Sequence, residues 1–107
     1  MKKFIIDDAF WEVFPEAKIG IIVFKGIDNR IRDVEAYDAM LRAAEKEAVK
    51  FFTEPEFSNN AVIKVWREAF QKFKTKKGAR SSIEALLKRV NNGNPVGTIN
   101  PLVDIYN

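Results

Sequence analysis

The pattern of apolar and polar positions changes its period along the chain and predicts strands first, then helices. Residues 18–25, KIGIIVFK, form a continuous apolar run of strand length, rich in β-branched residues, which is typical of a strand buried on both faces. Residues 3–6 predict a second, shorter strand. Between these runs, Asp7 or Asp8 can cap one or two helical turns, which end at Pro15 because the residue before a proline disfavours helix.

Residues 33–52 carry apolar side chains at the spacing of a helix, with charged side chains on the opposite face. Residues 53–60 predict a loop, and a second helix follows it. Trp66, Phe70 and Phe73 form an aromatic stripe along that second helix. The stripe could stack on nucleic-acid bases, but its helical spacing favours a face packed in the core.

Both ends of a third helix are marked in the sequence. Ser81 and Glu84 have the spacing of a capping box, and Gly93 is suited to the position just past the last turn. Asn100 followed by Pro101 indicates the start of a further short helix. That helix has about one turn before the sequence ends, and isolated helices of this length are unstable in water. We therefore expect an incomplete domain.

These elements predict one α+β domain over residues 1–107, with three main helices packed against a small sheet started by residues 3–6 and 18–25. An incomplete domain would leave an unpaired sheet edge and an exposed apolar patch. Both favour a homo-oligomer or association with the rest of the domain.

The composition removes several classes of site. The chain has neither Cys nor His, so disulfides, thiolate nucleophiles and zinc sites built on these residues are excluded. We expect no metal and no cofactor. The apolar runs are all shorter than the roughly 18–20 residues that cross a bilayer. Since no secretory cleavage site follows the first residues, a cytoplasmic location without membrane association is expected.

The charge is unevenly distributed along the chain. Residues 1–60 hold 9 Lys and Arg against 12 Asp and Glu, whereas residues 61–107 hold 9 against 3. The basic half predicts a nucleic-acid-binding face, and a merely solvated helix surface is the alternative. Arg80 directly precedes a helix start, where an anion would be favoured; an ion pair with Glu84 or Asp104 is the other interpretation. The candidate nucleic-acid-binding residues are Lys74, Lys76, Lys77, Arg80, Lys88 and Arg89.

The chain resembles a known family in three segments, which occur in the family's order. They are WREAFQKF (66–73), ARSSIEALLKRV (79–90) and INPLVDIYN (99–107). The chain resembles the tRNA-editing domain of the phenylalanyl-tRNA synthetase β subunit, and most closely its free-standing homologues. The resemblance covers nearly the whole chain and is most specific over its last thirty or so residues. It implies a tRNA or aminoacyl-tRNA partner, and a pocket for the aminoacyl group that includes Asn107, with Tyr106 beside it.

In that family the domain hydrolyses tyrosine wrongly attached to the phenylalanine tRNA. The family's later portion supplies a His and a Glu that recognise the tyrosine hydroxyl, and this chain has no His. We therefore expect the chain alone to be inactive in editing, and we assign no catalytic residue. The sequence leaves three functions open: an editing hydrolase domain, a non-catalytic RNA- or tRNA-binding module, and a protein-interaction module.

Overall fold

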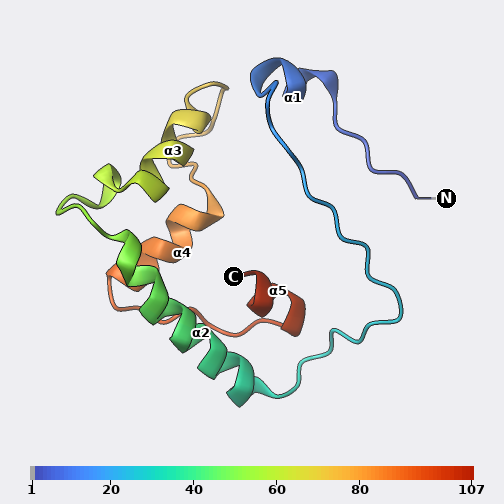
Figure 1. The fold of residues 1–107 in the computed structure, drawn as a ribbon, viewed down its shortest axis with the longest axis vertical. Helices are drawn as coiled ribbons and strands as arrows, with labels where there is room; N and C mark the ends of the chain where they lie inside the picture. Colours follow the sequence, from blue (N-terminus) through green and yellow to red (C-terminus); the bar gives the residue numbers. More distant parts are fainter. Residues whose placement is uncertain (1) are drawn as a thin grey trace.

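Five α-helices make up most of the regular structure in the computed structural model, which describes residues 2–107 (Figure 1). The three longest are the three main helices that the apolar period predicts. Single 3-10 turns follow the second helix and precede the third. The elements, in chain order, are α1 (Asp8–Val13), α2 (Val34–Ala48), the turns Val49–Phe51 and Phe57–Asn59, α3 (Ala61–Phe70), α4 (Ser82–Asn91) and α5 (Pro101–Tyr106).

The predicted sheet is absent, and the predicted α+β class is wrong: residues 2–107 contain helices and no strand. Residues 3–6 and 18–25 have no ladder bonds to another segment of the described chain. A β-branched apolar run favours extended backbone, but a sheet also requires a neighbouring segment to pair with its N–H and C=O groups. Neither predicted strand has that neighbour.

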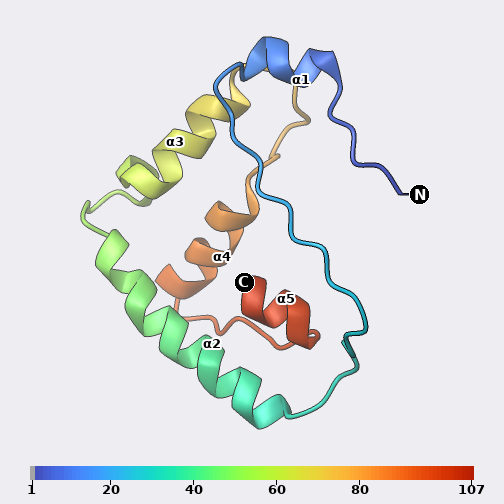
Figure 2. The same cartoon turned by 45° about the vertical axis from the view of Figure 1, so that its right-hand side comes forward.

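The helices and the long segment between α1 and α2 form an open ring (Figures 1 and 2). α4 packs against α2 and α3, and α5 packs against α2. Several contacts connect the two sides of the ring. The Phe14 ring meets the Phe73 ring edge-on at 6.1 Å, and the Lys72 ammonium lies 5.7 Å from the centroid of the Phe14 ring. The Leu102 N–H donates to Asn29 Oδ1 at 2.8 Å. The radius of gyration is 16.7 Å, against about 13 Å for a compact chain of this length.

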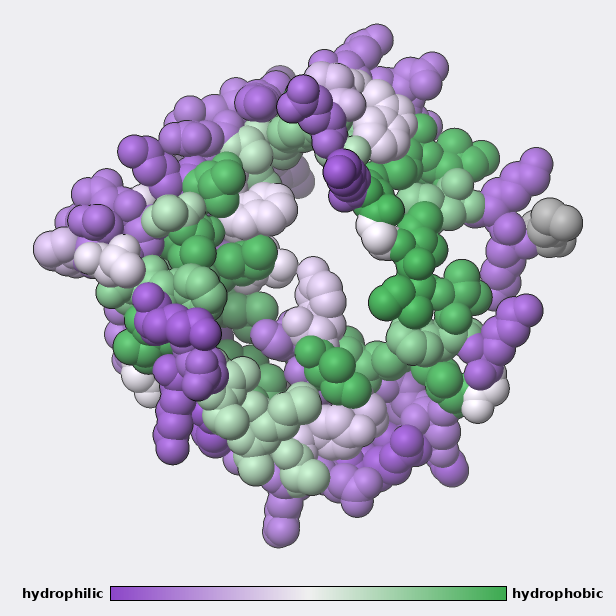
Figure 3. Space-filling model, viewed as in Figure 1, coloured by the Kyte–Doolittle hydropathy of each residue, from purple (hydrophilic) through white to green (hydrophobic). Residues whose placement is uncertain are grey.

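The ring has a small core. The buried apolar residues among residues 2–107 are Leu41, Ile63, Val96 and Pro101. Many other apolar residues surround a central opening, as the space-filling view shows (Figure 3). The aromatic stripe is only partly covered, because Phe70 is half-buried while Trp66 and Phe73 are 42% and 43% exposed. The predicted core face of α3 therefore lacks the sheet that was expected to cover it.

The predicted helix ends are confirmed for α4 and α5. Ser81 Oγ accepts a hydrogen bond from the Glu84 N–H at 3.1 Å, and Gly93 takes φ +74° just past the last turn of α4. Asn100 Oδ1 accepts from the Val103 N–H at 2.9 Å, and a proline occupies the first turn of α5. The capping box is only half formed, because the Glu84 carboxylate points to α3 instead.

Asn60 fixes the connection between α2 and α3. Its side chain is almost fully buried, and its Oδ1 accepts from the backbone N–H groups of Thr53 at 2.8 Å and Glu54 at 2.9 Å. Its Nδ2 donates to the Phe57 carbonyl at 3.0 Å. One amide thus satisfies three backbone groups of a loop that would otherwise be free to unfold.

Candidate nucleic-acid interface

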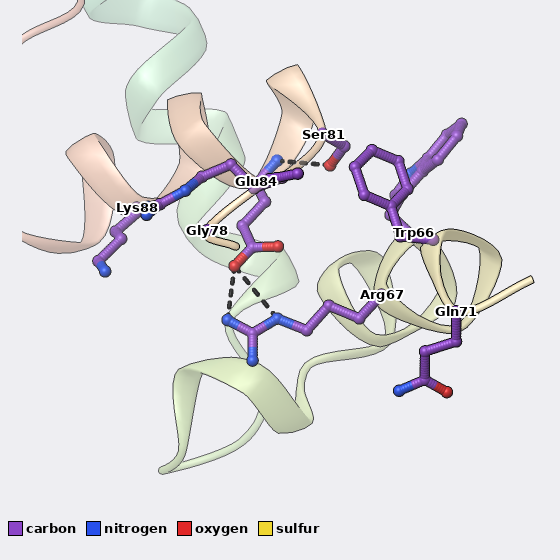
Figure 4. A pocket seen from close by; sticks show the side chains of 10 residues that line it. Trp66, Arg67, Gln71, Gly78, Ser81, Glu84 and Lys88 are labelled. Carbon is purple, nitrogen blue, oxygen red and sulfur yellow. Dashed lines mark hydrogen bonds and ion pairs between the residues drawn. The ribbon is translucent and has the colours of Figure 1, made fainter. Parts of the chain in front are cut away.

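A pocket of about 340 Å³ lies between the second half of α3 and the start of α4 (Figure 4). Trp66 and Phe70 give it apolar walls from α3, and Ser81 and the residues before it form another side. Charged side chains from both helices and from the preceding loop complete the lining: Arg67, Arg80, Glu84 and Lys88. The pocket therefore combines an aromatic surface with several cations.

An ion pair joins the two helices at this pocket. The Arg67 guanidinium donates from Nε at 3.1 Å and from Nη2 at 2.5 Å to the same oxygen of Glu84, which is 5% exposed (Figure 4). Donating hydrogen bonds to the Glu84 carboxylate raises the pKa of Arg67 above its ordinary value, so Arg67 stays protonated. The pair fixes α3 against α4 and neutralises both charges.

Arg80 and Lys88 are the cations of the pocket that remain uncompensated. Among residues 2–107, neither forms an ion pair, because Glu84 pairs with Arg67 and the buried Asp104 carboxylate accepts from the Ile99 N–H at 2.7 Å. The ion-pair interpretation of Arg80 is therefore wrong. Arg80 stands before the first turn of the ten-residue helix α4, whose positive dipole end adds to the attraction for an anion.

The other predicted nucleic-acid-binding residues lie in two different environments. Lys74, Lys76 and Lys77 are exposed on residues 71–81, here called the lysine loop, which leads from α3 into the pocket. Arg89 instead faces the other end of α4, where its guanidinium donates to the Pro95 carbonyl at 2.8 and 3.3 Å. The structure thus brings two of the six residues to the pocket and three to its approach, and gives Arg89 a structural contact.

The predicted aminoacyl-pocket residues lie at the end of α5. Tyr106 is 79% exposed and lines neither of the pockets that contain Trp66. Asn107 lines a second, mostly apolar pocket of about 350 Å³, to which α2, α3 and α4 contribute. Trp66 borders both this apolar pocket and the basic one.

Arg67 is the functional residue that sequence reasoning missed. It lies on the polar side of the predicted second helix, where its spacing gives no sign of a partner on another helix. Its counterpart, Glu84, is predicted from the sequence as half of a capping box or as a partner of Arg80, not of Arg67. One signal is present in the sequence: Glu84 is the sole acid in residues 72–89. An ion pair between Glu84 and a nearby Lys or Arg could therefore be expected.

Residues 2–107 contain neither a cluster of metal-ligating side chains nor a membrane-spanning helix. Residues 2–107 hold no group of three or more acidic side chains placed to bind a metal ion. Nor does any helix in that range have the length and apolar character that a bilayer crossing requires.

Comparison with known proteins gives no match: no protein-family model, curated protein or solved structure is similar to this chain. The resemblance to the synthetase editing domain therefore stays a prediction from the sequence segments alone.

Proposed function

We propose that this chain binds RNA, and tRNA in particular, through the basic pocket and the lysine loop. The observation that carries the proposal is the pair of uncompensated cations, Arg80 and Lys88, beside the exposed indole of Trp66. Cations hold the phosphate backbone, and an aromatic face accepts an unstacked base. The tRNA class comes from the family resemblance, and for such a partner we expect a cytoplasmic location.

Each part of the site has a distinct role in this proposal. A phosphate would bind between the Arg80 guanidinium and the first N–H groups of α4, with Lys88 about two turns further along the helix. The lysine loop adds less specific attraction because its side chains are exposed and long. The Arg67–Glu84 pair positions the two helices and contacts no phosphate itself.

The salt dependence of tRNA binding tests this assignment. The association constant falls with salt, and each lost phosphate contact makes the slope of log K against log salt less steep by about 1. The slope of the Arg80→Ala/Lys88→Ala variant should therefore be less steep by about 2. Lys2→Ala/Lys3→Ala removes the same charge from the opposite part of the chain and serves as the matched control. Equal losses in the two double variants would show that only net charge attracts the tRNA.

A second candidate function is recognition of the aminoacyl group of a mischarged tRNA, with hydrolysis only in a complete editing domain; the position of Asn107 favours it. Asn107 borders an apolar pocket large enough for an aromatic side chain. Because the chain has no His, we expect it to bind aminoacyl-tRNA without releasing the amino acid. Release of tyrosine above the uncatalysed rate, abolished in Asn107→Ala, would instead establish this chain as a hydrolase.

A further inference from the structure

The segment between Pro15 and Gly26 exposes a run of apolar residues, 19–24, with a lysine at each end. Side chains from Ile19 to Phe24 are 42–78% exposed, apart from Gly20, which has none. Within residues 2–107, no backbone group of residues 18–25 forms a hydrogen bond to another backbone group. The segment also stands apart from the three main helices (Figure 1). It thus has the properties of a strand that lacks its partner.

The area that the chain leaves exposed is large enough for a stable interface. The accessible surface is 8995 Å², whereas a compact monomer of 12.3 kDa exposes about 6,100 Å². The excess is about 2,900 Å², several times the roughly 800 Å² that each partner buries in an interface of standard size. The exposed apolar side chains of the segment contribute part of this excess, and a second protein surface would remove that part from water.

We propose that residues 16–26 pair with the same residues of a second copy, as two antiparallel strands related by a two-fold axis. Pro15 limits the pairing at one end because it has no N–H, and Gly26 limits it at the other because its φ of +67° turns the chain. In a symmetric antiparallel pair one residue must face its own copy. The midpoint of residues 16–26 is Ile21, so Ile21 faces Ile21.

This register is complementary along its whole length, which favours a second copy over an unrelated partner. Ile19 faces Val23, and Lys18 faces the aromatic ring of Phe24. Lys25 faces Ala17, so no charged residue opposes another charged residue. Apolar cross-strand pairs stabilise a sheet, and like charges directly opposite would weaken it. The pairing would also satisfy backbone groups that are open in the single chain.

Cysteine cross-linking tests the register directly, since the chain has no Cys of its own. In Ile21→Cys the two introduced residues would face each other with Cα atoms about 4.5–5.5 Å apart, within the range that a disulfide spans. Val23→Cys is the matched control, because its two copies would lie four residues apart along the strands, about 13 Å. We expect Ile21→Cys to form covalent dimers at least tenfold faster than Val23→Cys, and a mixture of Ile19→Cys with Val23→Cys to form mixed dimers.

Sedimentation gives a second, independent measurement on the chain without cysteines. The native chain should sediment as a dimer, and Ile21→Asp, which places two carboxylates opposite each other, should weaken dimerisation at least tenfold while leaving the helical circular dichroism unchanged. A native chain that is monomeric at millimolar concentration overturns the proposal, as does equal cross-linking at positions 21 and 23. The proposal stands independently of RNA binding, because the segment lies outside the basic pocket.

Discussion

Replacing Arg67 by Ala tests whether the Arg67–Glu84 ion pair holds α3 against α4 at the basic pocket. The variant removes two hydrogen bonds, from Nε and Nη2, to a single oxygen of the buried Glu84 carboxylate. A buried charge left without its partner costs about 3–5 kcal/mol. Arg67 is half-exposed and the pocket admits water, so screening reduces the expected loss to about 2 kcal/mol.

Urea unfolding followed by circular dichroism measures this loss. Lys64→Ala is the matched control on the same helix, since Lys64 is exposed and a surface substitution of this kind changes the free energy of unfolding by less than about 0.5 kcal/mol. Adding Glu84→Gln to Arg67→Ala should recover about 1 kcal/mol, because the unpaired charge is then gone. An Arg67→Ala variant as stable as Lys64→Ala would refute the role of the pair.

Two further predictions concern the polar groups that hold the loops and helix ends. Asn60→Ala leaves the backbone N–H groups of Thr53 and Glu54 without their acceptor and should lower the free energy of unfolding by about 2 kcal/mol in the same urea assay; a loss under about 0.5 kcal/mol would contradict it. Ser81→Ala removes the N-cap of α4 and should lower the free energy of unfolding by about 1 kcal/mol. Ser82→Ala, one residue into the helix, should lower it much less, and equal losses in the two variants would show that the cap hydrogen bond does not stabilise the helix.

Local signals in the sequence predicted the helices well. α2, α3 and α4 follow the apolar period, and the caps Ser81 and Asn100 form their hydrogen bonds. These features depend on residues three or four positions apart, so a single sequence contains all the information they need.

The sheet could not be predicted in the same way, because a strand depends on a segment that is distant in sequence. The apolar, β-branched run at residues 18–25 predicted a buried strand, which is wrong, because nothing within the run shows whether a partner strand exists. Helical spacing also predicted that Trp66 and Phe73 are core residues, but no sheet covers that face of α3 in residues 2–107, and both residues remain more than two-fifths exposed.

The candidate site was predicted in part. Arg80 and Lys88 were found from the clustering of cations, and both line the basic pocket. Arg89 belonged to the same cluster, yet it bonds the Pro95 carbonyl, since its position on the helix faces away from the pocket. Arg67 was missed because its link to Glu84 joins two helices, and a helical period shows only neighbours within one helix.

Tryptophan fluorescence during a tRNA titration tests the central proposal most directly. The chain has two tryptophans, Trp66 in the basic pocket and Trp11 on α1. If a base stacks on Trp66, Trp11→Phe should keep the tRNA-dependent quenching, and Trp66→Phe should lose it. Quenching that persists in Trp66→Phe and disappears in Trp11→Phe would place the RNA elsewhere and contradict the assignment of the pocket.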